Sequence, residues 1–256
     1  LDLVFLFTGD FDAQSDGEKP LSATQYFNRL ATRVVGALSV QTAAGALYEI
    51  DTRLRPSGAQ GLLCASLDAF AKYQYEEAWT WEHMALARAR PVFGSDAGCA
   101  QLQSIVTDTL SMERDADELR DNVVQMRRDM AAHKPPKGPL DIKLLPGGLV
   151  DMEFIIHYLQ LRHHVGLRPQ LSKAIMALSQ AGHLPTNFVD CYNLLGRILV
   201  TIRLVAPDCD EPPEAARALV AKSLALPDWE AVTDAIESAR EAVLTQWQQH
   251  LGTRQF

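Results

Sequence analysis

The order of the secondary-structure signals limits the fold of this chain more than any other feature of its sequence. Residues 1–8, LDLVFLFT, contain β-branched and aromatic side chains and predict a strand. Residues 46–55, ALYEIDTRLR, predict a second strand. From Ser66 onward, nearly every segment has the apolar spacing of an amphipathic helix. Strands that come first and helices that follow indicate an α+β part attached to a helical bundle.

The helical segments are separated by polar loops that contain glycine and proline. Helices are expected at residues 22–38, 66–90, 115–133, 149–165, 171–181, 187–205 and 229–251. The helical pattern is interrupted most clearly at residues 134–148, KPPKGPLDIKLLPGG. From the order of strands and helices we expect an α+β domain at residues 1–110 and a mainly helical domain at residues 111–256.

Composition and charge exclude several classes of protein. No apolar run approaches the roughly 20 residues that span a bilayer, and 22% of the residues are charged. The formal net charge of −8 argues against non-specific binding to nucleic acid, which needs a cationic surface. The four cysteines lie far apart and form no C-x-x-C pair, as is typical of reduced thiols. We expect a cytoplasmic protein without a nucleic-acid or membrane partner.

Residues 47–61, LYEIDTRLRPSGAQG, place charged side chains inside an apolar segment. Side chains alternate along a strand, so Glu49, Asp51 and Arg53 would share one face. If the two predicted strands are neighbours, Asp2 and Asp51 come together. Two close carboxylates repel each other unless a cation lies between them, and Mg²⁺ suits such oxygen ligands. A metal site built on Asp2 and Asp51 is therefore one interpretation.

Ion pairing within the same segment is the other interpretation. Asp51 could pair with Arg53 or with Arg55. The guanidinium fork fits a carboxylate and a phosphate equally well, so the residue types alone leave both interpretations open.

Three sequence blocks resemble one family. Residues 48–63, YEIDTRLRPSGAQGLL, continue into residues 70–92, FAKYQYEEAWTWEHMALARARPV, and both resemble glutamine synthetase adenylyltransferases. Residues 141–154, DIKLLPGGLVDMEF, resemble that family's second long signature. The family has two nucleotidyltransferase halves: one adds AMP to a tyrosine of glutamine synthetase, and the other removes it by phosphorolysis. RLRPSG with EAWTWEHMALARAR is similar to the adenylylating, C-terminal half.

The resemblance implies a nucleotidyltransferase core like that of DNA polymerase β at residues 1–110. That superfamily has a G-S-D-x-D motif on one strand and a third aspartate on a later strand. Asp2 is similar to the second aspartate and Asp51 to the third. The first aspartate and the Gly-Ser turn would precede Leu1, so the resemblance implies a fragment with an incomplete core.

The implied enzyme is a magnesium-dependent protein adenylyltransferase that uses ATP. Asp2 and Asp51 would be its catalytic metal ligands. In this chemistry two Mg²⁺ ions straddle the α-phosphate, one activating the tyrosine oxygen and the other stabilising the leaving pyrophosphate.

Further charged residues in the three blocks are candidates for contact with the nucleotide: Arg53, Arg55, Arg88, Lys143, Asp151 and Glu153. Each has a structural alternative. The arginines can pair with carboxylates, and acidic residues in the first turn of a helix complement its dipole. The Gly147–Gly148 pair before that helix could let backbone N–H groups meet a phosphate, or could simply be a turn.

The sequence leaves three hypotheses about function. The first is transfer of AMP from ATP to a tyrosine of glutamine synthetase, which regulates nitrogen assimilation. The second is a non-catalytic helical module that docks onto glutamine synthetase or the PII signal protein. The third, uridylyl transfer to PII, is disfavoured by the TWEHMALARAR block at residues 80–90.

Overall fold

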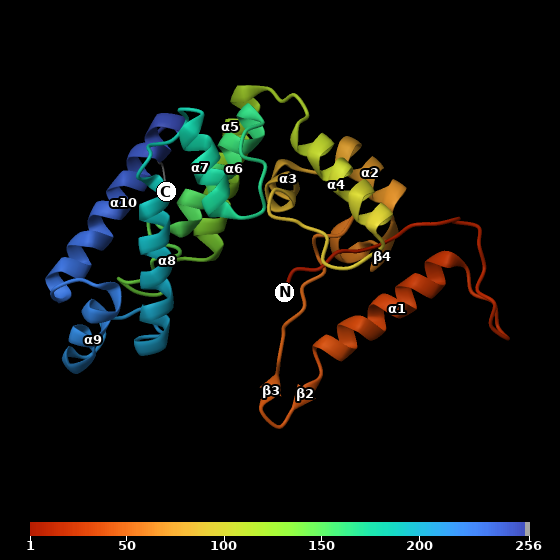
Figure 1. Ribbon diagram of the computed structural model, residues 1–256, viewed down its shortest axis with the longest axis horizontal. Helices are drawn as coiled ribbons and strands as arrows, with labels where there is room; N and C mark the ends of the chain where they lie inside the picture. Colours follow the sequence, from red (N-terminus) through yellow and green to blue (C-terminus); the bar gives the residue numbers. More distant parts are fainter. Residues whose placement is uncertain (254–256) are drawn as a thin grey trace. The chain divides into compact units, whose positions relative to one another are not determined.

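The chain forms two compact units in a computed structural model that describes residues 1–253 (Figure 1). Unit 1 contains Leu1–Ala85 and Arg90–Thr109. Unit 2 contains Leu86–Ala89 and the chain from Leu110 onward. Unit 1 combines short strands with helices, and unit 2 is helical. The expected α+β class with a helical second part is confirmed, whereas the nucleotidyltransferase identity of the core stays a prediction.

Unit 1 is organised around a parallel pair of strands. β1 (Phe5–Phe7) pairs with β4 (Cys64–Ser66) in the register that places Phe5 opposite Cys64. Between them the chain forms α1 (Ala23–Leu38) and a small hairpin. The hairpin consists of β2 (Gln41–Thr42) and β3 (Gly45–Ala46).

The strand predicted at residues 46–55 is wrong for most of its length. In this segment only Ala46, the end of β3, and Asp51, an isolated bridge, have strand pairing. The start of the segment is not covered by the core, since Leu47 is 75% and Tyr48 40% exposed. The strand that does pair with β1 is β4, which ends at Ser66, the residue at which the sequence analysis expects a helix to begin.

Aromatic stacking and one amide hold α1 against the strand pair. The rings of Phe7 and Phe27 are stacked with centroids 4.6 Å apart. The Asn28 side chain donates to the Cys64 carbonyl oxygen and accepts from its N–H, both at 3.1 Å. Phe7 and Cys64 are buried with Ala23 and Ala31 in one core cluster. This core fixes the direction in which β1 and its preceding residues run.

Residues 66–90 form two helices instead of the one long helix expected. α2 (Leu67–Glu76) and α3 (Thr80–Leu86) are separated by a break at residues 77–79. The Glu82 carboxylate stabilises this break, because it accepts a hydrogen bond from the Trp79 N–H at 2.9 Å and another from the Tyr73 hydroxyl at 2.9 Å. α4 (Asp96–Leu110) follows.

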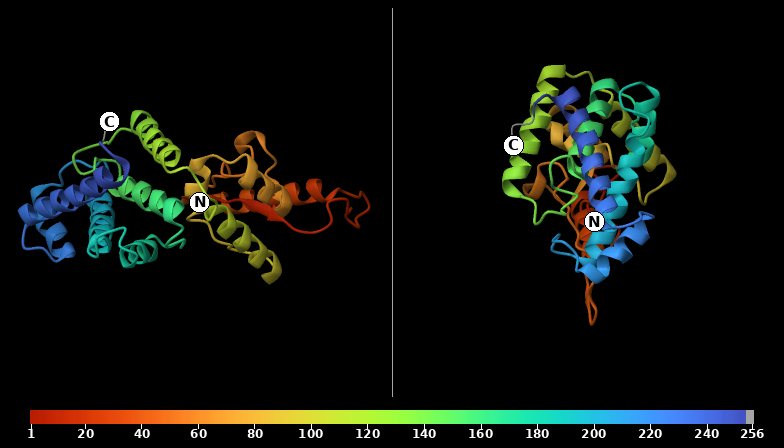
Figure 2. Two further views of the ribbon diagram at one scale, coloured as in Figure 1. Left: turned by 90° about the horizontal axis from the view of Figure 1, so that it is seen from above. Right: turned by 90° about the vertical axis from the view of Figure 1, so that its left-hand side faces the viewer.

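Unit 2 is a bundle around one buried helix. Its helices are α5 (Ala116–His133), α6 (Leu149–His163), α7 (Leu171–Gln180), α8 (Phe188–Val205), α9 (Glu214–Leu224) and α10 (Trp229–Leu251). α6 packs against α5, α7, α8 and α10 (Figure 2). Eleven of its 15 residues are buried, as expected for a helix that is apolar on nearly all sides.

The helices predicted at residues 22–38, 115–133, 149–165, 171–181, 187–205 and 229–251 are confirmed to within two residues at each end. α4 was missed by the sequence analysis, and so was α9. The alanine-rich sequence of α9 gives a weak periodic pattern, and its Leu219 is 62% exposed.

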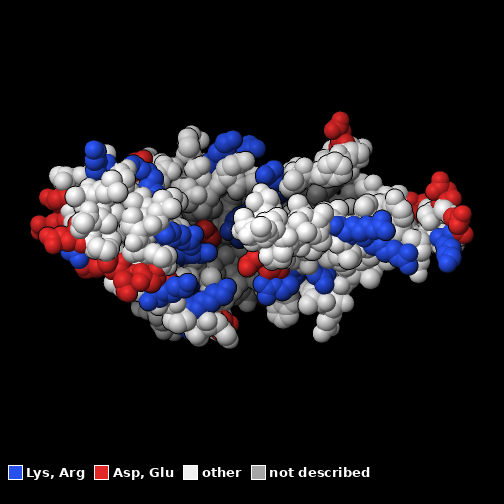
Figure 3. Space-filling model, turned by 90° about the horizontal axis from the view of Figure 1, so that it is seen from below, with Lys and Arg blue, Asp and Glu red and all other residues white. Residues whose placement is uncertain are grey.

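The surface and the helix lengths agree with the composition. Acidic and basic side chains both occur across the face of the molecule that Figure 3 shows. Within residues 1–253, no helix combines the length and the apolar character needed to cross a membrane.

Candidate functional site

Asp2 and Asp51 are direct partners across two parallel chain segments of unit 1. The Leu3 N–H donates to the Asp51 carbonyl oxygen at 2.8 Å, and the Asp51 N–H donates to the Leu1 carbonyl oxygen at 2.7 Å. Partners that lie opposite each other in a parallel ladder project to the same face. The two carboxylates therefore share one face, although the second predicted strand is absent. Their role as metal ligands stays a prediction.

The Asp51 carboxylate is paired with Arg53. Nε of Arg53 donates to Oδ1 and Oδ2 of Asp51 at 3.0 Å each, and its Nη2 contacts Oδ2. The Arg53 backbone N–H also donates to Oδ1 at 2.9 Å. The hydrogen bond from the Arg53 side chain, followed by that from its backbone, lowers the pKa of Asp51 from its ordinary 3.8 to about 2. Asp51 is therefore ionised at neutral pH.

Arg55 supports the loop that follows Asp51. Its guanidinium donates to the carbonyl oxygens of Thr52, Ala59 and Gly61 at 2.8, 3.1 and 3.1 Å, and to the Thr52 hydroxyl at 2.9 Å. At Gly61 a Cβ would lie 1.9 Å from the Pro56 carbonyl oxygen, so only glycine fits. These contacts favour a structural role for Arg55.

The donor set at Asp2 and Asp51 suits a cation that is shared with a ligand. Within residues 1–253, no group of three or more His, Cys, Asp or Glu side chains is placed to hold a metal ion. A closed protein cage is thus not formed by the described residues. Mg²⁺ is commonly held by one or two carboxylates together with waters and substrate phosphates. Two carboxylates on one face fit this second kind of site.

Asp151 lies in the interior of unit 2. It forms an ion pair with Arg127, in which Nε and Oδ1 are 2.7 Å apart and the two side chains are 0% and 2% exposed. Its Oδ2 accepts from the Gly147 N–H at 2.7 Å. Arg127 also donates to the Leu144 carbonyl oxygen at 3.2 Å. The structure therefore favours a structural role for Asp151: it joins α5 to the loop before α6.

The glycine pair before α6 is a packing requirement. A Cβ on Gly147 would lie 2.4 Å from the Arg240 carbonyl oxygen, and one on Gly148 would lie 2.4 Å from the Ile142 carbonyl oxygen. The N–H groups of this turn are already used, since Gly147 donates to Asp151 and Gly148 donates to the Leu145 carbonyl oxygen at 2.8 Å. The turn interpretation of Gly147–Gly148 is therefore favoured over phosphate binding.

Arg88, Lys143 and Glu153 form a charged cluster in unit 2. Nη1 of Arg88 lies 3.5 Å from Oε2 of Glu153, and their side chains are 50% and 32% exposed. Burial raises the pKa of Glu153, while the positive charges of Arg88 and Lys143 act in the opposite direction. These three predicted residues thus lie together. Asp151 is on the same helix as Glu153, but its partners are Arg127 and Gly147.

A buried histidine lies one turn beyond Glu153 on α6. His157 is 4% exposed, and its Nδ1 is 2.8 Å from Oε1 of Gln160. Among the described residues, its buried Nε2 has no hydrogen-bond partner. Burial lowers the pKa of His157 from 6.5 to about 4. The sequence analysis did not single out Arg127.

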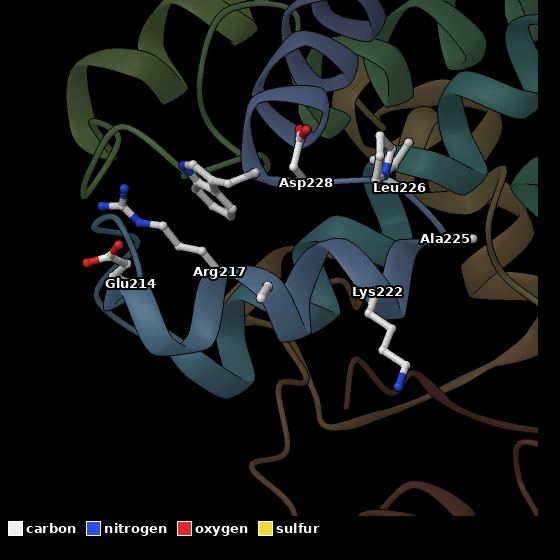
Figure 4. Close-up of a pocket in the computed structure, with 9 residues that line it drawn as sticks. Glu214, Arg217, Lys222, Ala225, Leu226 and Asp228 are labelled. Atoms are coloured by element: carbon white, nitrogen blue, oxygen red, sulfur yellow. The ribbon is translucent and has the colours of Figure 1, made fainter.

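A surface groove lies elsewhere in unit 2. It is formed by α9 and the start of α10, has a volume of about 720 Å³, and includes Arg217 and Trp229 in its lining (Figure 4). The guanidinium carbon of Arg217 lies 5.7 Å from the centre of the Trp229 ring. None of the predicted site residues lines this groove. The groove is open, and its arginine is already paired with Glu211, so the chemistry of the carboxylates marks the better candidate site.

Comparison with known proteins identifies the family. Residues 1–105 match the family model described as glutamate-ammonia ligase adenylyltransferase. The chain is 40% identical over 242 residues to a protein of Brucella suis biovar 1 (strain 1330). The aligned region covers 91% of this chain and 25% of the relative. It is 44% identical over 204 residues to a protein of Pseudomonas syringae pv. tomato (strain ATCC BAA-871 / DC3000). Here the aligned region covers 72% of this chain and 21% of the relative.

Both relatives are named bifunctional glutamine synthetase adenylyltransferase/adenylyl-removing enzyme. The chain spans a quarter or less of their length. Because the similarity to the Brucella protein extends over nine-tenths of the chain and the family model covers most of unit 1, the chain belongs to the glutamate-ammonia ligase adenylyltransferase family.

Proposed function

We propose that this chain is part of an enzyme that transfers AMP from ATP to a tyrosine of glutamine synthetase. The names of the relatives support adenylyl transfer and removal as the two possible reactions. The likeness of RLRPSG and EAWTWEHMALARAR to the adenylylating half supports transfer. The PII signal protein is proposed as a second partner on the same resemblance alone.

The observation that carries the proposal is the pairing of Asp2 with Asp51. Two acidic residues that are 49 positions apart in the sequence are held opposite each other by two backbone hydrogen bonds. The low pKa of Asp51 keeps its carboxylate charged, and the backbone N–H of Arg53 orients it. When bound there, Mg²⁺ would stabilise the charge that develops on the phosphate oxygens.

The basic groups are proposed to contact the anionic nucleotide. Arg53 lies next to the carboxylates in unit 1. The prediction that Arg88 and Lys143, of the charged cluster in unit 2, contact a nucleotide rests on the family resemblance alone. A guanidinium binds phosphate oxygens in the same forked geometry that it uses with a carboxylate.

The direct test measures AMP transfer by a full-length protein that contains this chain. The matching quarter of the Brucella suis relative is replaced by this chain, and the chimera is incubated with ATP, Mg²⁺ and glutamine synthetase. We expect glutamine synthetase to gain the mass of one AMP per subunit, on a tyrosine. Binding of glutamine synthetase without any mass gain would contradict the proposal and support the docking module.

The substitution Asp51→Asn tests the role of the carboxylate within that chimera. The change keeps the shape of the side chain and removes its charge, so we expect the transfer rate to fall by about 100-fold or more, as for the loss of a group that stabilises transition-state charge. Asp16→Asn, in an exposed loop of unit 1, is the matched control and should keep the full rate. A near-normal rate for Asp51→Asn would rule out the metal-ligand role.

A further inference from the structure

The guanidinium of Arg53 occupies the position at Asp51 where a cation would bind. It contacts both carboxylate oxygens, through Nε at 3.0 Å to each and through Nη2 to Oδ2. The negative charge of Asp2 also acts on Arg53, in the direction that raises its pKa. Arg53 therefore offsets the charge of Asp51 by direct contact and interacts favourably with the charge of Asp2.

This ion pair is exposed, unlike the pair of Arg127 with Asp151. The side chains of Arg53 and Asp51 are 78% and 33% exposed, against 2% and 0% for Arg127 and Asp151. Exposed pairs are screened by water and salt and contribute little to stability. Arg55, by contrast, is tied to three carbonyl oxygens of its loop. Arg53 can thus leave its partner without disturbing the fold.

The carboxylate of Asp51 has a second support that does not depend on the guanidinium. The Arg53 backbone N–H donates to Oδ1 at 2.9 Å, and the Asp51 backbone is bound on both sides to the segment that carries Asp2. If the guanidinium moves away, Oδ2 becomes free while the carboxylate keeps its orientation. A divalent cation would therefore find a ligand that is already in place.

We propose that Arg53 is an exchangeable counter-ion of Asp51, which a divalent cation displaces so that the guanidinium can bind the phosphates of the nucleotide. The proposal rests on the proposed function. A divalent cation carries twice the charge of the guanidinium and competes for the same oxygens. Because the fork of Arg53 fits carboxylate and phosphate alike, the released side chain can pass from one to the other. Cation and nucleotide should then each strengthen the binding of the other.

The exchange can be observed on the side chain itself. The ¹⁵N-labelled 256-residue chain is titrated with Mg²⁺, and the arginine Nε–H signals are followed by NMR; the Arg53 signal is assigned by its loss in Arg53→Lys. We expect the Arg53 Nε–H to shift and to exchange faster with water as Mg²⁺ binds. The Arg127 Nε–H, which is buried against Asp151, is the internal control and should not change.

Cation affinity gives the second readout. Binding of Mn²⁺ is measured by electron paramagnetic resonance for the chain and for Arg53→Gln, Arg53→Lys and Asp51→Asn. Removing the competing guanidinium should tighten Mn²⁺ binding several-fold in Arg53→Gln. Arg53→Lys keeps the charge but loses the fork, so it should also bind more tightly than the unchanged chain. Arg33→Gln, an exposed arginine on α1, is the control and should bind as the unchanged chain does.

The outcomes separate this inference from the proposed function. If Mn²⁺ binds and Asp51→Asn abolishes binding, but the Arg53 signal stays unchanged and Arg53→Gln and Arg53→Lys show no gain, the exchange is refuted while the metal site stands. If only Arg53→Gln binds more tightly, the effect is one of charge at a distance, and the exchange is again refuted. If the chain binds neither Mg²⁺ nor Mn²⁺, both proposals are overturned.

Discussion

Two aspartate–arginine pairs of this chain show how burial changes the role of the same residue types. The pair of Asp51 and Arg53 is largely exposed, and the pair of Asp151 and Arg127 is enclosed in the bundle. A buried charge that loses its partner stays in a medium that solvates it poorly, so such a pair is hard to break. The exposed pair leaves its carboxylate open to other cations, whereas the enclosed pair holds two segments together.

Loss of one partner of the enclosed pair should destabilise unit 2. Replacing Arg127 by Met leaves the Asp151 charge buried and unpaired, and we expect the free energy of unfolding to fall by about 3–5 kcal/mol. Arg53→Met is the matched control and should unfold at the urea concentration of the unchanged chain, because its pair is exposed. Urea unfolding measures both.

The double substitution Arg127→Met with Asp151→Leu removes both charges and should recover much of the lost stability. If Arg127→Met unfolds at the same urea concentration as the unchanged chain, the interpretation of Asp151 as a structural residue is wrong.

The elements of the chain differ in how well their sequence predicts them. α6 was predicted closely because its apolar residues and the preceding glycines mark both its start and its character. The strand predicted at residues 46–55 failed because alternation alone says nothing about a packing partner, and Leu47 has none that buries it. The facing positions of Asp2 and Asp51 could be anticipated, since that placement needs only one bridge between parallel segments.

The burial of Arg127 could have been anticipated from the pattern of α5. Leu119 and Val123 are buried and four residues apart, and Arg127 follows at the same spacing. A charged residue at an apolar position of a helix indicates a buried ion pair. The second member of the pair could not be chosen from the sequence, because the loop geometry at residues 134–148 decides which carboxylate reaches α5.

His157 should make the stability of α6 and its bundle depend on pH. Its pKa is about 4 in the folded chain and close to its ordinary 6.5 in the unfolded chain. Between these values the unfolded state binds more protons, so the stabilisation is complete above pH 6.5 and is lost as the pH falls towards 4. When the pH falls from about 7.5 to about 5, we expect the contribution of His157 to lower the free energy of unfolding by about 2 kcal/mol.

The measurement is urea unfolding at both pH values for the unchanged chain and for His157→Gln. The amide of glutamine does not titrate, so the loss on acidification should be smaller by about that amount in the variant. His133→Gln is the control, because His133 is an exposed residue at the end of α5. An equal loss of stability for His157→Gln and the unchanged chain would contradict the lowered pKa of His157.

At the scale of the whole molecule, the candidate residues are divided between the two units. Asp2, Asp51, Arg53 and Arg55 belong to unit 1, and Arg88, Lys143, Asp151 and Glu153 belong to unit 2. The family model ends at residue 105, close to the end of unit 1, while the similarity to the Brucella protein covers 91% of the chain. The likeness to the family is thus a property of both units.

The proposed function requires that Asp2 and Asp51 hold one divalent cation together with a nucleotide. Anomalous X-ray scattering from crystals of the chain grown with Mn²⁺ and ATP locates such an ion directly. We expect a manganese peak within about 2.5 Å of an oxygen of Asp2 and an oxygen of Asp51, with a phosphate of ATP on the same ion. Bound ATP whose manganese contacts neither carboxylate would contradict it.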